Sequence, residues 1–243
     1  MGDTENPSDN NDGHYFDRFL DIQTSTNENV PETSLQIRQH SVGDVGAVVW
    51  DSALVACKYF EQTNLQCPGC YRGLRALELG AGTGVCGLTL AALGAQQVVL
   101  TDLPCQLALL HENVTLNKHV VARNGDTSVT VQPLCWGSDE DYDAIIAERS
   151  ATEFFDLILL IDCLYYQESL TPLFDTLKRC CGPKTTALCV YEKRDVGLPE
   201  RVQREFFEII NGTFNASKVP DCQLHPDYRS EDIEVLRLTR ISP

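Results

Sequence analysis

The feature that most constrains the fold is a glycine-rich turn, Glu78-Leu79-Gly80-Ala81-Gly82-Thr83-Gly84, between two apolar segments. Residues 74–79 predict a strand that runs into this turn, and residues 85–93 predict a helix that ends at Gly94. Glycine allows backbone conformations that a Cβ forbids, and it lets the main chain approach a ligand closely. A strand, a glycine turn and a helix in this order are typical of α/β domains that bind a nucleotide-like ligand.

The alternation of strand and helix continues along the chain. Residues 155–161 are almost entirely apolar, as expected of a central strand that is buried on both faces. The other strands are expected at residues 98–101, 129–134, 186–191, 214–219 and 233–238, and the other helices at 48–61, 105–118, 170–180 and 200–210. This pattern predicts an α/β fold with a doubly wound, mostly parallel, seven-stranded sheet and helices on both faces.

The N-terminal segment differs from the rest of the 243-residue chain in composition. Residues 1–33 hold eight acidic residues and one basic residue, and we expect them to form a disordered or poorly ordered acidic segment. Residues 34–243 are expected to form the single folded domain, beginning with a short strand at 34–39. The formal net charge is −16, which argues against nucleic-acid binding and suits a partner with basic groups.

Other sequence features limit the cellular setting. No stretch approaches the roughly 18 consecutive apolar residues of a membrane-spanning helix, and no secretion signal opens the chain. Eleven cysteines without such a signal indicate a reducing compartment, and we expect the cytoplasm, with the nucleus as an alternative. Cys67 and Cys70 have the spacing of a redox or half-zinc motif, but no second pair completes four ligands, so we expect no metal site.

The glycine turn alone leaves two kinds of cofactor open. Gly82-Thr83-Gly84-Val85-Cys86-Gly87 also satisfies the dinucleotide fingerprint, and Asp102 at the end of the next strand could bind the ribose of either cofactor. Glu78 favours the other option, because a carboxylate before the first glycine would repel a pyrophosphate and attract a cationic sulfonium ligand. The turn therefore favours S-adenosylmethionine over a dinucleotide.

A second motif follows the buried strand, at Asp162-Cys163-Leu164-Tyr165-Tyr166. Together with the glycine turn, it resembles the seven-β-strand protein-lysine methyltransferases of methyltransferase family 16. Segments 46–51, 134–137 and 228–233 extend the resemblance, which covers residues 46–240. The family's fold is Rossmann-like, and the resemblance implies an antiparallel last strand.

The resemblance also implies site residues. Trp50 would border the cofactor, the glycine turn would carry its methionine end, Asp102 would take the ribose hydroxyls and Trp136 would lie by the adenine. The expected cofactor-binding residues are Trp50, Glu78, Gly80, Ala81, Gly82, Gly84, Asp102, Trp136 and Ile161. The expected catalytic residues are Asp162, Tyr165 and Tyr166.

These implied roles agree with the chemistry of lysine methylation. A lysine must lose a proton from an ammonium of pKa about 10.4 before it attacks a methyl group. Asp162 can attract the ammonium, and Tyr165 and Tyr166 can enclose it through cation–π contact. Within the family the resemblance points to the valosin-containing AAA ATPase as the protein substrate and to a monomeric enzyme. A heat-shock-70-type substrate and a non-catalytic cofactor-binding module are the alternatives.

Overall fold

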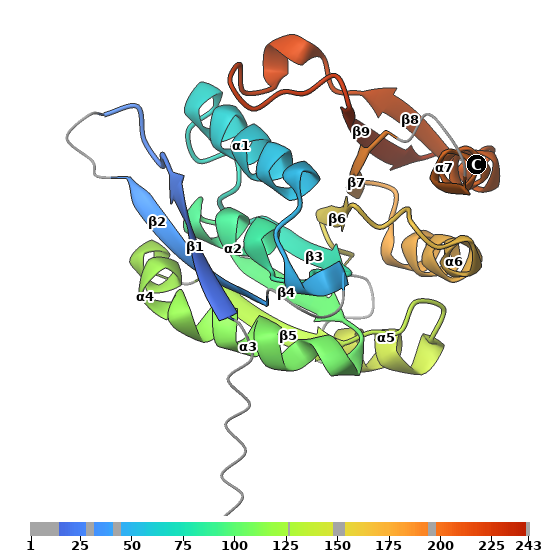
Figure 1. Ribbon diagram of the computed structural model, residues 1–243, viewed down its shortest axis with the longest axis horizontal. Coiled ribbons are helices and arrows are strands. Elements are labelled where there is room, and N and C mark those ends of the chain that lie inside the picture. The colour runs from blue at the N-terminus through green and yellow to red at the C-terminus, as the bar shows by residue number, and fades with distance from the viewer. Residues whose placement is uncertain are drawn as a thin grey trace, which may run out of the picture.

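The computed structural model describes residues 15–27, 32–40, 45–125, 127–147, 154–193 and 198–241. These residues form a central seven-stranded sheet with helices on both faces, and a two-stranded hairpin beside it (Figure 1). The strands of the sheet are β3 (Arg75–Leu79), β4 (Gln97–Asp102), β5 (Ser128–Pro133), β6 (Leu157–Ile161), β7 (Thr186–Glu192), β8 (Phe214–Lys218) and β9 (Ile233–Arg240). The helices are α1 (Asp51–Gln66), α2 (Val85–Ala92), α3 (Leu107–Leu116), α4 (Lys118–Val121), α5 (Asp139–Ile146), α6 (Leu170–Cys180) and α7 (Leu198–Ile210).

The sheet has the strand order β5-β4-β3-β6-β7-β9-β8. β3 pairs in parallel with β4 on one side and with β6 on the other, so the order of the strands reverses between β3 and β6. β9 runs antiparallel to both β7 and β8. The predicted doubly wound, mostly parallel sheet with an antiparallel last strand is confirmed. In such sheets ligands bind at the carboxyl ends of the strands where the order reverses.

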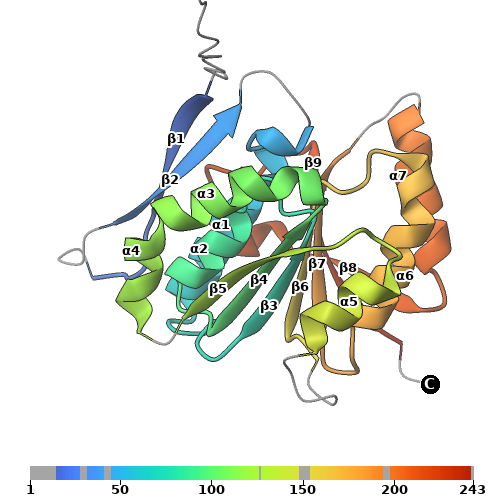
Figure 2. The same ribbon diagram turned by 90° about the horizontal axis from the view of Figure 1, so that it is seen from below.

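Both faces of the central strands are buried, as their continuous apolar sequences predict. On β3, Leu77 and Leu79 pack into one hydrophobic cluster while Ala76 packs into the other. α1 and α2 cover the face of Ala76, and α5, α6 and α7 cover the opposite face. Figure 2 shows these two layers on either side of the sheet. The strand ends are therefore held in place by packing on both sides.

Two helical segments differ from the sequence-based expectation. α5 was not expected from the sequence. It is only eight residues long, opens with three acids and carries few apolar positions. The sequence nevertheless holds a signal for the start of this helix, which is Ser138. Its hydroxyl accepts a hydrogen bond from Asp141 N, as an N-cap residue does. The helix expected at 105–118 is shorter, because a 3-10 turn at Pro104–Gln106 precedes α3.

The N-terminal segment contains a hairpin where disorder was expected. β1 (Tyr15–Ile22) pairs antiparallel with β2 (Thr33–His40), and Leu20 and Ile22 of β1 are buried. The expectation was wrong for Tyr15–Ile22, because the acidic average composition of residues 1–33 concealed a strand in which five of eight residues are apolar or aromatic. Residues 1–14 lie outside the described part of the chain. Among the described residues, no helix has the length and hydropathy to cross a membrane.

Candidate functional site

The glycine turn follows β3 and brings the main chain close to two neighbouring segments. Gly80 and Gly82 have φ of 64° and 53°, a region that favours glycine. A Cβ on Gly80 would lie 2.9 Å from Cζ2 of Trp136, and a Cβ on Gly82 would lie 2.8 Å from the Gly46 carbonyl oxygen. The turn therefore forms a bare backbone surface that leaves no room for side chains.

Asp102 ends β4 and fixes the same turn. Its Oδ2 accepts a hydrogen bond of 2.7 Å from Gly82 N, and its Oδ1 accepts one of 2.7 Å from Leu103 N. Ala81 N donates to the Thr101 carbonyl at 2.8 Å, which continues the pairing of β3 with β4 into the turn. The carboxylate of Asp102 is thus oriented by backbone donors at the edge where a ligand would bind.

Glu78 lies on β3 beneath the turn and is almost completely buried. Its Oε2 accepts a hydrogen bond of 2.8 Å from Gly87 N in the first turn of α2. A Cβ on Gly87 would lie 2.8 Å from that same carboxylate oxygen and 2.3 Å from Leu100 Cδ2. Burial raises the pKa of Glu78 to about 8, against an ordinary value of 4.5. Glu78 therefore holds α2 against the sheet as well as lining the site.

The raised pKa of Glu78 predicts how the stability of the ligand-free protein depends on pH. The folded state binds this proton more tightly than the unfolded chain, so the free energy of unfolding falls as pH rises from about 4.5 to about 8. In Glu78→Gln we expect this decline to be reduced, with a stability gain at pH 8 on the order of a few kcal/mol. Urea denaturation of the wild-type protein and Glu78→Gln at pH 5 and pH 8 measures this difference. An equal change in the free energy of unfolding between the two pH values in both proteins would contradict the prediction.

A cavity of about 740 Å³ opens at the carboxyl ends of β3, β4 and β6. Trp50 from the start of α1, Trp136 from the loop after β5 and Ile161 from the end of β6 all line it. The acids Glu78, Asp102, Asp162 and Glu168 also line it, and no Lys, Arg or His is among its described lining residues. The cavity is therefore acidic, which suits a cationic ligand.

Asp162 follows β6 with an unusual backbone conformation. Its φ of 56° makes it the one residue other than glycine with a positive φ in the described part of the chain. Its N–H donates to the Val190 carbonyl at 2.7 Å, which holds the residue beside β7. Strained backbone of this kind costs free energy and concentrates at functional sites. The side chain lines the cavity.

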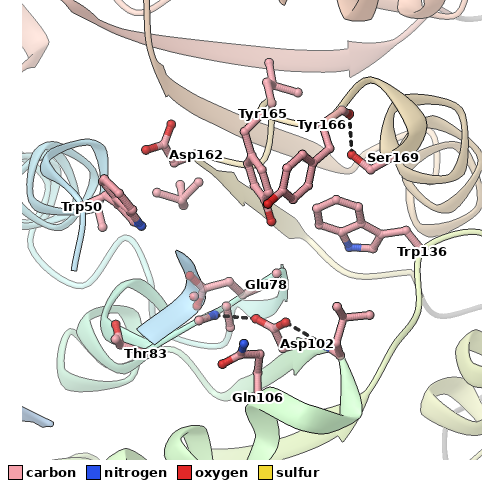
Figure 3. A pocket seen from close by; sticks show the side chains of 18 of the residues that line it. Trp50, Glu78, Thr83, Asp102, Gln106, Trp136, Asp162, Tyr165, Tyr166 and Ser169 are labelled. Atoms are coloured by element: carbon pink, nitrogen blue, oxygen red, sulfur yellow. Dashed lines mark hydrogen bonds between the residues drawn. The ribbon is translucent and has the colours of Figure 1, made fainter. Parts of the chain in front are cut away.

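Tyr165 and Tyr166 lie in the loop after Asp162 and line the same cavity (Figure 3). Their ring centroids are 4.6 Å apart in an edge-to-face arrangement, and about half of each side chain is exposed. The Tyr166 carbonyl accepts a hydrogen bond of 2.8 Å from the Ser169 hydroxyl, so the loop is held at the start of α6. The two rings form the outer wall of the cavity.

The structure brings together all but one of the residues expected from the sequence. The exception is Gly84, which is absent from the cavity lining and instead begins α2 in a left-handed conformation. A Cβ there would meet the side chain of Leu110 at 2.5 Å, so Gly84 allows close packing of two helices. Cys67 and Cys70 are exposed in a turn after α1, and neither lines the cavity. The described residues contain no cluster of three or more potential metal ligands.

Several polar lining residues were not singled out from the sequence. Gln106 comes from the 3-10 turn after β4, and Gln203 comes from α7, where its Nε2 donates to the Glu192 carbonyl at 2.6 Å. No local pattern marks these glutamines, since only the tertiary fold brings them to the site. Glu168 is different, because its position in the loop of Asp162 could have marked it.

The donor end of the cavity fits S-adenosylmethionine. Gly80 and Gly82 line the cavity with bare backbone, close to Trp136 and Gly46, and Asp102 lines the same cavity. The acidic lining matches the positive charge of a sulfonium and an ammonium. A pyrophosphate would meet the acids Asp102, Asp162 and Glu168 without a basic residue among the described lining.

Comparison with known proteins agrees with this fit. Residues 29–213 match the lysine methyltransferase family. The chain belongs to this family. As a lysine methyltransferase it is an enzyme, and S-adenosylmethionine is its methyl donor.

Two relatives show how far the likeness of this lysine methyltransferase extends. It is 32% identical over 210 residues to the EEF1A lysine methyltransferase 3 of Xenopus tropicalis, covering 86% of this chain and 82% of the relative. It is 34% identical over 180 residues to the protein N-lysine methyltransferase METTL21A of Mus musculus, covering 71% of this chain and 74% of the relative. Both relatives are named for transfer to protein lysine.

A solved structure supports the fold. The O-methyltransferase of Bacillus cereus, determined in complex with SAH, aligns with a TM-score of 0.50 at 17% identity. The alignment covers 81% of this chain and 84% of that one. The lysine methyltransferase thus shares the overall architecture of enzymes whose acceptors are chemically different. The acceptor must therefore be argued from the residues around Asp162 and not from the fold.

Proposed function

We propose that Asp162, Tyr165 and Tyr166 receive the acceptor lysine of a protein substrate opposite the glycine turn. The observation that carries this proposal is the meeting of two kinds of surface in one cavity, a backbone surface from β3 and an acidic, tyrosine-lined loop from β6. S-adenosylmethionine, when bound, would supply a methyl group on a cationic sulfur. A neutral amine aligned with the methyl carbon can take that methyl group, and the sulfur is the group that leaves.

Asp162 attracts and orients the lysine. Its carboxylate lies at the end of β6, beside the turn that follows β3, because β3 and β6 are adjacent in the sheet. Glu168 in the same loop adds a second acid to the lining. These charges favour the approach of an ammonium, and alignment of the amine then lowers the barrier to transfer.

Tyr165 and Tyr166 surround the aliphatic part of the lysine and exclude water from its end. Two aromatic rings 4.6 Å apart can offer both apolar contact and cation–π attraction to an ammonium. Partial removal of water favours the neutral amine over the ammonium, which is the form that attacks. The tyrosine pair thus complements Asp162, which holds the charged form during approach.

We propose the valosin-containing AAA ATPase as the substrate. The support is the sequence resemblance of segments 117–119 and 228–233 to the family member that acts on this ATPase. The second of these segments lies at the carboxyl end of β7, since Lys193 N donates to the Asp232 carbonyl at 2.6 Å. It therefore lies at the edge of the sheet where the cavity opens.

All eleven cysteines are free, which is consistent with a cytoplasmic enzyme.

Elongation factor EEF1A is a second candidate, favoured by the name of one relative. A heat-shock-70-type chaperone is a third substrate to include. Incubation of the purified enzyme with tritiated S-adenosylmethionine and each protein separates them. We expect label on a lysine of the ATPase, and label on EEF1A or the chaperone alone would overturn the choice of substrate. SAH binding without transfer to any of the three would instead favour a non-catalytic binding module.

A further inference from the structure

The two outer edges of the N-terminal hairpin differ in how their backbone groups are satisfied. On β2, Gln36 N donates to Asn117 Oδ1 at 3.0 Å, and Asn117 Nδ2 donates to the Gln36 carbonyl at 2.8 Å. Asn113 makes the same pair of bonds with Arg38, at 2.7 and 3.0 Å. Two asparagine side chains of the α3 region therefore close this edge as a neighbouring strand would.

The outer edge of β1 is open over part of its length. Gln36 and Arg38 direct their backbone groups away from β1, so their cross-strand partners Phe19 and Asp17 direct theirs away from β2. Asp21 continues this series, and its carbonyl does accept a bond of 2.7 Å from Lys58 Nζ. Among the described residues, no partner satisfies the outward N–H and C=O of Asp17 and Phe19.

The open part of β1 also carries exposed aromatic side chains. Phe19 is 65% exposed, Tyr15 is 50% exposed and Phe16 is 45% exposed. Large apolar side chains on an unpaired strand are usually avoided in monomeric proteins, because another chain can pair with them. Residues 1–14 precede this strand with four acids and no Lys or Arg, so the sequence around it is acidic. A basic, extended segment would complement it in shape and charge.

The hairpin is connected to the rim of the cavity. Gln39 of β2 accepts a hydrogen bond of 2.7 Å from Val49 N through its Oε1, and the neighbours Val48 and Trp50 line the cavity. Figure 2 shows β2 between β1 and α3, with β1 on the outside. A segment paired with β1 therefore lies on the same side of the molecule as the start of α1 and its cavity-lining Trp50.

We propose that β1 is a docking strand, on which an extended basic segment of the protein substrate pairs through the backbone of Asp17 and Phe19. The inference rests on the proposed function, because the docked chain is the one that presents the acceptor lysine. Strand addition of this kind takes its affinity from main-chain hydrogen bonds, and alternate side chains supply specificity. Phe19 and Tyr15 would contact apolar residues of the segment, and the acidic sequence that precedes β1 favours basic residues in it.

The test uses the full-length enzyme and the valosin-containing ATPase as substrate. Phe19→Pro removes the outward N–H while leaving the bonds between β1 and β2 intact, since proline is tolerated at an open edge. We expect KM for the ATPase to rise about tenfold through the loss of backbone pairing and aromatic contact, with kcat unchanged. SAH affinity by calorimetry should not change. Phe19→Thr keeps the N–H but loses the aromatic ring, so its KM should lie between those of the wild-type enzyme and Phe19→Pro.

Ser34→Pro on β2 is the matched control, since it places a proline on the same hairpin away from the open edge. An equal rise of KM in Ser34→Pro and Phe19→Pro would show a general effect on the hairpin and overturn the proposal. So would an unchanged KM in Phe19→Pro while the wild-type enzyme methylates the ATPase. No transfer by the wild-type enzyme would overturn the choice of substrate and this inference together. A wild-type dimer in sedimentation that Phe19→Pro abolishes would assign β1 to self-association and also overturn it.

Discussion

Asp162→Asn is expected to reduce methyl transfer by about a hundredfold or more while leaving SAH affinity within about threefold. The substitution keeps the size and hydrogen-bonding shape of the side chain but removes its negative charge. Loss of one group that stabilises charge or alignment at a reacting centre costs about 100-fold to 1000-fold in rate. Asp162 lies in the acceptor loop, so the cofactor should bind almost normally. Single-turnover transfer with tritiated donor, together with SAH calorimetry, measures both effects.

The backbone at Asp162 decides which substitution is informative. Its φ of 56° lies in the left-handed region, which Asn and Gly adopt more easily than Ala. Asp162→Ala would combine the loss of charge with strain, whereas Asp162→Asn removes the charge alone. Asp162→Gly is the companion variant, because it relieves strain and also lacks the carboxylate. Full activity in Asp162→Asn would show that the Asp162 charge has no part in methyl transfer and that the residue only shapes the turn after β6. Our assignment of the acceptor loop would then be wrong.

The parts of the fold that depend on local pattern could be predicted from the sequence. β6 and α6 were expected at 155–161 and 170–180, and the structure has them at Leu157–Ile161 and Leu170–Cys180. β1 could not be predicted in the same way, because its apolar and aromatic residues do not alternate strictly and the surrounding sequence is acidic. Leu20 and Ile22 become informative only when α1 and β2 bury them.

The site shows the same division. Asp102 and Asp162 could be predicted because Asp102 ends one buried strand and Asp162 directly follows another, and the ends of parallel strands meet at one edge. Gln203 could not be predicted, since it lies on α7 and reaches the cavity only through the packing of that helix. Glu78 was expected to meet the ligand, and the structure shows that it also accepts a hydrogen bond from Gly87 N. A Cβ on Gly87 would lie 2.8 Å from the Glu78 carboxyl oxygen, so close packing of α2 on the sheet explains this third glycine of the apparent dinucleotide fingerprint.

Gly82→Ala is expected to weaken SAH binding at least a hundredfold, since its new Cβ would lie 2.8 Å from the Gly46 carbonyl oxygen. Both atoms belong to backbone segments that line the cavity, so neither can move without changing its shape. The φ of 53° adds about 1–2 kcal/mol of strain for a residue with a Cβ. The shift would also disturb the bond of 2.7 Å from Gly82 N to Asp102, the carboxylate at the donor end. Calorimetry with SAH measures the loss of affinity.

Gly73→Ala separates strain from contact, because Gly73 has a φ of 77° and a Cβ there would meet nothing within 4 Å. It should lose stability by a similar strain and bind SAH as the wild-type enzyme does. Equal SAH affinity in Gly82→Ala and Gly73→Ala would mean that the close approach of Gly82 to Gly46 does not shape the donor site. A selective loss in Gly82→Ala would instead tie cofactor affinity to two backbone segments, the turn after β3 and the loop before α1. Since that loop continues to Trp50 and is held to β2 by the hydrogen bond from Val49 N to Gln39, the loss would link the donor site to the hairpin through this bond.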